Sequence, residues 1–257
     1  MELSKILKRF AAGLKAIDDT SSWQGTSART GATYLAGVPA MTERQLCHEL
    51  VQWWTSTFPN DFNPVGTCHE EVPYPGLSRA RCDIVFSSEP NDGVPEWAIE
   101  VKRIQFIGDN GKKNDHNVQK MLSPYMKDRS LVHDIERMRK HPIASRHAVI
   151  GYAFSYDYKT CAEAERLHPE HWNRIAEIRK VCKENDQANG RLLCQEIVEI
   201  ADVQFRYLGI VSDHKTAPIR DLWRHPCGGH GTVFGWEVND EVDSAPHQDS
   251  QGQQELF

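Results

Sequence analysis

The chain has 257 residues, of which 39% are hydrophobic and 26% charged, so its composition excludes the disordered and fibrous classes. No apolar stretch reaches the roughly 20 residues that cross a bilayer, and we therefore expect a cytoplasmic protein with no membrane span. The formal net charge of -6 excludes a uniformly basic surface, so any nucleic-acid contact must come from a local patch of Lys and Arg.

The N-terminal segment, residues 1–40, is expected to form a helix and a linker. Leu3, Leu7 and Phe10 recur at helical spacing, and residues 18–37 are rich in Ser, Thr and Gly. The basic residues of this helix are most simply explained as a solvated face.

A second helix is predicted to begin after Thr42, whose hydroxyl can cap the helix, and to end at Pro59. Leu46, Leu50 and Trp54 fall on its apolar face.

Three short strands, a helix and a fourth strand are predicted next. The strands are expected at 67–74, 81–86, 97–106 and 147–154. Helical patterning appears at 118–125 and 131–139, before the fourth strand, which is apolar on most positions as in strands covered on both faces. The order from Thr42 onward is therefore helix, three strands, helix, strand.

The C-terminal part predicts two helices within 161–200, broken near Asn189 and Gly190, and two further strands at 203–211 and 232–238. Residues 240–257, dominated by Gln, Asp, Ser and Glu, are expected to be disordered.

We therefore expect one domain at 41–239, with its core at 42–154 and an elaboration at 155–239.

Chemistry is indicated by two of these strands. Asp83 lies in Arg-Cys-Asp-Ile-Val-Phe, and Glu100 and Lys102 lie in Trp-Ala-Ile-Glu-Val-Lys. Side chains alternate along a strand, so Glu100 and Lys102 share one face while Ile99 and Val101 take the other. An acid and a lysine on a buried strand need a partner or a metal ion to offset their charges. Two carboxylates can hold Mg²⁺, whose bound water attacks phosphorus, while the lysine orients that water or neutralises charge.

Asp83 followed by Glu100-Val101-Lys102 resembles the PD-(D/E)xK nuclease superfamily, with Cys82 in place of the proline and a match over roughly residues 42–154. The resemblance implies an α/β fold in which a central mixed β-sheet is flanked by helices, a restriction-endonuclease-like αβββαβ core with a C-terminal elaboration. It also implies a nuclease that hydrolyses DNA with Mg²⁺, for which Mn²⁺ substitutes. Asp83 and Glu100 would hold the metal, and Lys102 would complete the catalytic set.

The superfamily also often carries a glutamate on the helix before the first strand. Glu43 is our preferred catalytic residue at that position, in a helix entry like that of archaeal Holliday-junction resolvases. Glu49 is the competitor, six residues further along the helix.

Four basic residues are candidate nucleic-acid contacts: Lys112, Lys113, Lys127 and Arg129. The first two lie in a glycine-containing loop directly after the catalytic strand, where the alternative is a solvated turn. The other two lie near a predicted helix end, where basic residues also complement the helix dipole.

Two further clusters carry weaker patterns. Glu70 and Glu71 could join a second metal, although ordinary polar strand positions explain them better. His225, Cys227 and His230 suggest zinc but have no fourth ligand nearby, which favours a glycine-rich turn.

We expect a restriction or defence endonuclease that acts on DNA, with a homodimer as one expected assembly. The alternatives are a repair or recombination nuclease and a non-catalytic nucleic-acid-binding or assembly protein that retains the fold. No GxxxxGK[ST] motif is present, so no nucleotide cofactor is expected.

Overall fold

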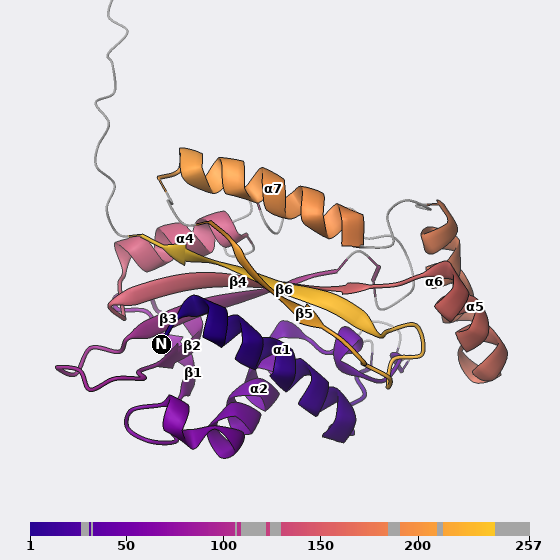
Figure 1. The fold of residues 1–257 in the computed structure, drawn as a ribbon, viewed down its shortest axis with the longest axis horizontal. Helices are drawn as coiled ribbons and strands as arrows, with labels where there is room; N and C mark the ends of the chain where they lie inside the picture. Colours follow the sequence, from indigo (N-terminus) through magenta and orange to yellow (C-terminus); the bar gives the residue numbers. More distant parts are fainter. Residues whose placement is uncertain are drawn as a thin grey trace, which may run out of the picture.

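A mixed six-stranded sheet between two layers of helices forms the structure, a computed structural model (Figure 1). The structure describes residues 1–26, 31, 33–105, 107–108, 122–123, 130–184, 191–209 and 213–239. The predicted α/β class, with a central mixed sheet flanked by helices, is confirmed.

The helices are α1 (Leu3–Thr20), α2 (Glu43–Thr57), α4 (Leu131–Lys140), α5 (Tyr158–Leu167), α6 (Trp172–Glu184) and α7 (Arg191–Tyr207). The strands are β1 (His69–Pro73), β2 (Arg81–Phe86), β3 (Trp97–Ile104), β4 (Arg146–Ser155), β5 (Lys215–Ile219) and β6 (His230–Val238). They lie in the order β1-β2-β3-β4-β6-β5, in which β3 and β4 are parallel and all other neighbours antiparallel.

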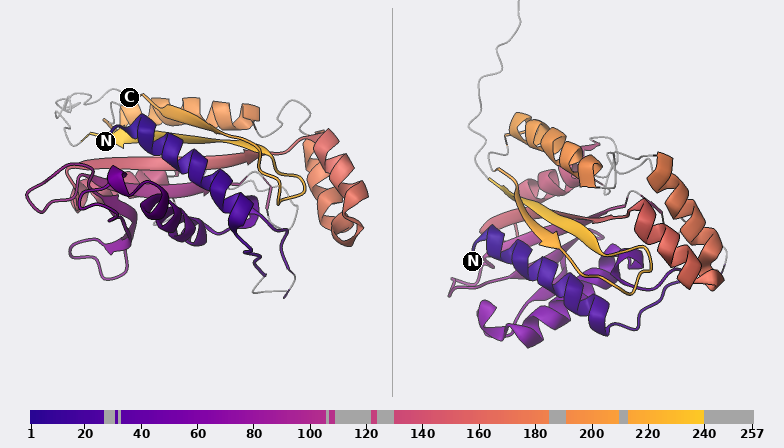
Figure 2. Two further views of the ribbon diagram at one scale, coloured as in Figure 1. Left: turned by 60° about the horizontal axis from the view of Figure 1, so that its bottom comes forward. Right: turned by 45° about the vertical axis from the view of Figure 1, so that its right-hand side comes forward.

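Two hydrophobic clusters lie on opposite faces of the sheet, because side chains alternate along each strand. Ile99 and Val101 of β3 pack with α1 and α2, whereas Ala98 and Ile104 pack with α4 and α7. Figure 2 shows the same layers and places α5 and α6 beyond one end of the sheet. The sheet is therefore covered on both faces.

The α1 helix shares the core of the sheet, although the sequence placed residues 1–40 outside the domain at 41–239. Leu7 and Phe10 are fully buried in the same cluster as Ile99 and Val101. The helix lies across β5 and β6 (Figures 1 and 2). Its apolar face is thus a packing surface, and the helix is joined to the sheet.

Of the elements predicted between Thr42 and residue 154, the helix after Thr42, the four strands and the helix at 131–139 are confirmed. Thr42 Oγ1 accepts a hydrogen bond from the Gln45 amide at 3.2 Å and so caps α2. The three strands, the helix α4 and the doubly covered strand β4 follow in the predicted order. The predicted helix at 118–125 lies largely outside the described residues.

The C-terminal predictions were partly wrong. The strand expected from Val203 is the end of α7, which buries Ala201 and Phe205 on one helical face. Three helices replace the predicted two, because a turn beginning at Pro169 separates α5 from α6. Strand β6 is confirmed, and β5 was missed because Pro218 argues against a strand except at a sheet edge, where β5 lies. The break near Asn189 and the tail 240–257 lie outside the described residues.

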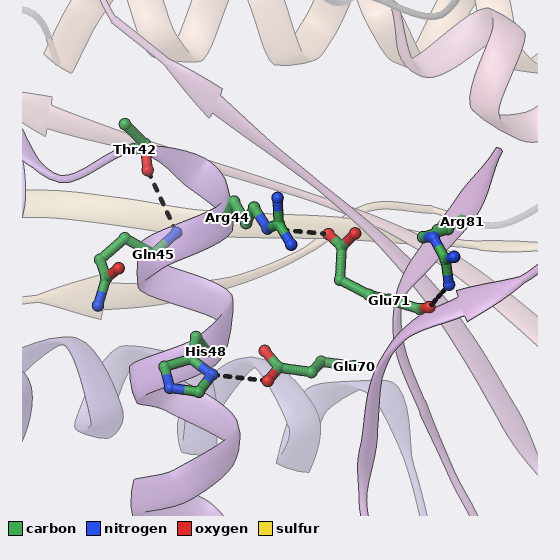
Figure 3. Close-up of a pocket in the computed structure, with 7 residues that line it drawn as sticks. All are labelled: Thr42, Arg44, Gln45, His48, Glu70, Glu71 and Arg81. Atoms are coloured by element: carbon green, nitrogen blue, oxygen red, sulfur yellow. Dashed lines mark hydrogen bonds and ion pairs between the residues drawn. The ribbon is translucent and has the colours of Figure 1, made fainter. Parts of the chain in front are cut away.

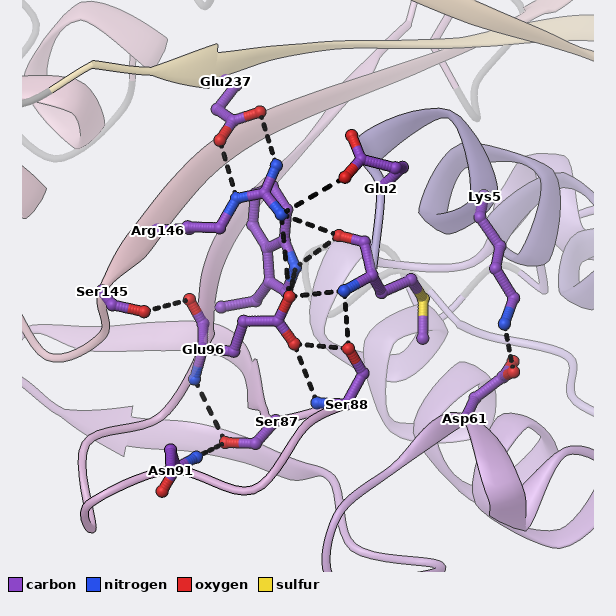
Figure 4. Close-up of polar contacts among 12 residues, drawn as sticks. Glu2, Lys5, Asp61, Ser87, Ser88, Asn91, Glu96, Ser145, Arg146 and Glu237 are labelled. Carbon is purple, nitrogen blue, oxygen red and sulfur yellow. Dashed lines mark hydrogen bonds and ion pairs between the residues drawn. The ribbon is translucent and has the colours of Figure 1, made fainter.

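A polar cluster joins β3, β4 and β6 at the end of the sheet where β3 begins (Figure 4). Arg146 makes two hydrogen bonds to the Glu237 carboxylate, at 2.8 and 3.0 Å, and lies 4.1 Å from the Trp97 ring centroid. These contacts hold the ends of β3, β4 and β6 together.

Asp61 carries a prediction about acid stability. Its buried carboxylate accepts hydrogen bonds from Lys5 and Arg9, each at 2.7 Å, and from the Trp54 indole at 2.9 Å. Burial alone would raise the pKa of Asp61, but these three donors hold it at about 2. Because the folded pKa is depressed, this contribution to stability is present above about pH 4 and is lost as pH falls toward 2.

We therefore expect Asp61→Asn to lower the free energy of unfolding by about 2 kcal/mol at neutral pH, with the difference shrinking at about pH 3. Urea unfolding of both proteins at the two pH values measures this. Asp92→Asn, at an exposed loop position, is the control. An equal loss at both pH values would show that packing rather than charge explains the role of Asp61.

Candidate active site

The candidate site lies where β2 and β3 separate. Their pairing runs from Phe86 opposite Trp97 to Ile84 opposite Ile99, whereas β3 continues beside β4 to Ile104. From Glu100 onward, the side of β3 that faces away from β4 has no strand partner among the described residues, so its backbone N–H groups need other acceptors.

Two of the predicted site residues supply these acceptors. Asp83 Oδ2 accepts from the Val101 amide at 2.7 Å, and Glu43 Oε1 accepts from the Arg103 amide at 3.2 Å. Amides two residues apart in a strand point the same way. Carboxylates from β2 and α2 are therefore set along one edge of β3, next to each other.

Glu100 turns toward α4, as strand alternation predicts. Its Oε1 accepts a hydrogen bond from the Tyr74 hydroxyl at 2.7 Å and lies 3.5 Å from Arg137 Nη2. Only 3% of Glu100 is exposed, so these contacts offset part of the cost of burying its charge.

Lys102 turns the same way. Its Nζ lies 3.2 Å from Asp134 Oδ2 and 4.0 Å from Glu43 Oε2, with 9% of the residue exposed. The lysine thus connects the acid of α2 to an acid of α4.

The sequence did not point to Asp134 or Tyr74, and it pointed to Arg137 only as a candidate contact to the nucleic-acid backbone. Asp134 is fully buried on α4 and forms an ion pair with Arg137 as well as with Lys102. It lies among the buried apolar positions of the helix, Leu131, Val132, Ile135 and Met138. The sequence pattern that could have identified Asp134 is a charged residue on the apolar face of a predicted helix.

Burial raises the pKa values of three acids of this site. Burial raises the pKa of Asp83 to about 6, although the Val101 amide and Lys102 oppose it. Burial, followed by the charges of Asp134 and Asp83, raises the pKa of Glu100 well above its usual range. Burial also raises the pKa of Asp134 despite the nearby Lys102 and Arg137. The carboxylates therefore repel one another.

A divalent cation fits this charge distribution. Among the described residues the site combines four carboxylates with the two cations that contact them: Glu43, Asp83, Glu100, Asp134, Lys102 and Arg137. When the four acids are ionised, negative charge is in excess, and carboxylate oxygens are the donors that Mg²⁺ prefers.

The side chains are not arranged as a finished metal site. In the part of the chain that the structure describes, no three His, Cys, Asp or Glu side chains converge to hold an ion. Asp83 and Glu100 each have an oxygen engaged by Val101 or Tyr74. Metal binding would therefore require these side chains to shift.

Other predicted residues within the described chain make contacts of their own. Glu49 accepts a hydrogen bond from Gln45 at 2.9 Å, one turn back along α2. His225 and Cys227 are buried, and the Cys227 amide donates to His225 Nδ1 at 3.2 Å. The candidate DNA contacts lie outside the described residues: Lys112, Lys113, Lys127 and Arg129.

The geometry defines a buried acid–lysine site at the open edge of a strand. Comparison of the chain with protein-family models, curated proteins and solved structures gives no match. Within the described residues, no helix is long and apolar enough to cross a membrane.

Proposed function

We propose that this protein is a Mg²⁺-dependent nuclease that hydrolyses DNA, with Mn²⁺ able to replace Mg²⁺. The observation that carries the proposal is the grouping of Asp83, Glu100 and Lys102 with Glu43 where β2 and β3 separate. The order α2, β1, β2, β3, α4, β4 supports a restriction-endonuclease-like core.

In this proposal each residue has its own task. Asp83 and Glu100 would hold the metal, which lowers the pKa of a bound water and polarises the phosphate. Lys102 would orient that water or neutralise the charge that develops on phosphorus. Glu43, close to Lys102, would keep the ammonium near the reacting phosphate.

A restriction or defence endonuclease is the role we propose within this class. The elements after residue 154 add β5, β6 and three helices, which gives room for a target-reading region. A homodimer with one site for each strand, and a cytoplasmic location, belong to the same proposal. A repair or recombination nuclease is the alternative role.

The test is cleavage of supercoiled, linear and single-stranded DNA with Mg²⁺, with Mn²⁺ and with EDTA. We expect metal-dependent cutting by the wild type and a loss of at least roughly a hundredfold in Lys102→Ala. Lys140→Ala, at an exposed lysine of α4, is the matched control and should cut normally.

No cutting by folded protein, together with no Mg²⁺ binding by calorimetry, would refute the nuclease. It would favour the second candidate, a nucleic-acid-binding or assembly protein with the same fold.

A further inference from the structure

A pocket of about 520 Å³ opens between α2 and the strands β1 and β2 (Figure 3). Its lining residues are Thr42, Arg44, Gln45, His48, Glu70, Glu71 and Arg81. Arg44 directly follows Glu43, and Arg81 lies two residues before Asp83 on β2. The pocket therefore adjoins the candidate site.

Two guanidinium groups approach Glu71 from opposite sides of this pocket (Figure 3). Arg81 Nη1 donates to the Glu71 carbonyl oxygen at 2.9 Å, and Arg44 Nε lies 4.0 Å from Glu71 Oε1. The Arg44 side chain is 82% exposed. A guanidinium has five N–H donors in a fork that matches the oxygens of a phosphate, so these contacts use few of them.

The backbone of Glu71 keeps this arrangement next to Asp83. Glu70 pairs with Ile84 and Val72 with Cys82, so Glu71 stands opposite Asp83. Its φ is 53°, an uncommon value for a residue with a side chain. The turned backbone places the Glu71 carbonyl where Arg81 binds it.

The acids of the pocket already have basic partners. Glu70 Oε1 lies 2.6 Å from His48 Nδ1, and the Glu71 carboxylate faces Arg44. The 4.0 Å separation of the second pair is too long for a hydrogen bond. An incoming phosphate would therefore compete with a weak contact when it binds Arg44.

We propose that this pocket binds the phosphodiester backbone of the DNA beside the bond that is cut, through Arg44 and Arg81. This inference rests on the proposed function, and it names the surface that positions the substrate. Contacts to phosphate do not depend on the base sequence of the DNA. They position the DNA strand relative to the metal site.

Binding of a labelled DNA duplex in EDTA, measured by fluorescence anisotropy over a range of salt concentrations, tests the proposal. We expect Arg44→Ala and Arg81→Ala each to weaken binding roughly tenfold. Each should reduce the slope of log affinity against log salt by about 1, because one phosphate contact is lost. Arg166→Ala, at a 68% exposed arginine of α5, is the control and should bind like the wild type.

The outcomes separate this proposal from the nuclease itself. Wild-type cleavage together with unchanged affinity and salt slope in both variants would overturn the pocket and leave the nuclease in place. No duplex binding by a wild type that does cut DNA would also overturn the pocket, whereas the nuclease is refuted only by the absence of both cutting and Mg²⁺ binding. Arg44 is highly exposed, so Arg44→Ala keeps the test valid if Arg81→Ala unfolds.

Discussion

Replacing Asp83 with asparagine is expected to abolish Mg²⁺-dependent cleavage and, without metal, to stabilise the protein above about pH 7. The first effect follows because the amide removes one of the two carboxylates proposed to hold the metal. We expect a loss of at least roughly a hundredfold.

The second effect follows from the pKa of Asp83, which burial raises to about 6 from an ordinary value of 3.8. A raised folded pKa means that stability is greatest below about pH 4 and is lost as pH rises through 6. Above that range the ionised carboxylate destabilises the metal-free protein by on the order of 2 kcal/mol, allowing for solvent at its partly buried side chain. Asparagine removes that charge and can still accept from the Val101 amide.

Thermal unfolding at about pH 5 and pH 8, with EDTA and with Mg²⁺, measures the stability effect. Mg²⁺ should raise the melting temperature of the wild type at the higher pH, because binding only the folded state stabilises it, and should not raise that of the variant. Glu49→Gln, on α2, is the control and should keep both cleavage and the metal response. A variant less stable than the wild type at the higher pH would contradict this account.

Replacing Asp134 with asparagine is expected to lower cleavage by on the order of 10- to 100-fold while leaving the fold intact. Asp134 Oδ2 lies 3.2 Å from Lys102 Nζ, so its charge holds the ammonium in position. Asparagine has the same shape but attracts the ammonium less strongly. The loss should fall on kcat, because Asp134 is fully buried on α4 and has no exposed surface with which to contact DNA.

The melting temperature of the Asp134→Asn variant distinguishes a role in positioning Lys102 from a structural role. Removing one partner of a buried ion pair usually destabilises a protein by several kcal/mol. Here burial outweighs Lys102 and Arg137 and raises the pKa of Asp134, so loss of its charge should not lower the melting temperature.

Cleavage kinetics and thermal unfolding, with Glu136→Gln at a half-exposed position of the same helix as the control, test this prediction. If kcat is unchanged, or falls only together with the melting temperature, Asp134 does not position Lys102. In the Lys102→Ala background the Asp134 substitution should cost little further activity, because the two residues act together.

The sequence by itself determined features that depend on neighbouring residues along the chain. The cap at Thr42 follows from one hydroxyl and the amide three residues on. The shared face of Glu100 and Lys102 follows from strand alternation, and both side chains do reach α4. The αβββαβ order also follows, since apolar periodicity identifies each element before its partners are known.

Only the tertiary structure decided which residues meet these side chains. Asp134 and Tyr74 approach β3 from α4 and from the segment after β1, and no local periodicity specifies that contact. The same reason explains α7, where Val203 and its apolar neighbours favour a strand locally but Phe205 packs on Trp236 as part of a helix. Periodicity along the chain predicts which face of its own helix or strand a residue occupies. The charged residues that a side chain meets depend instead on the order of the strands and on the packing of α4 against the sheet.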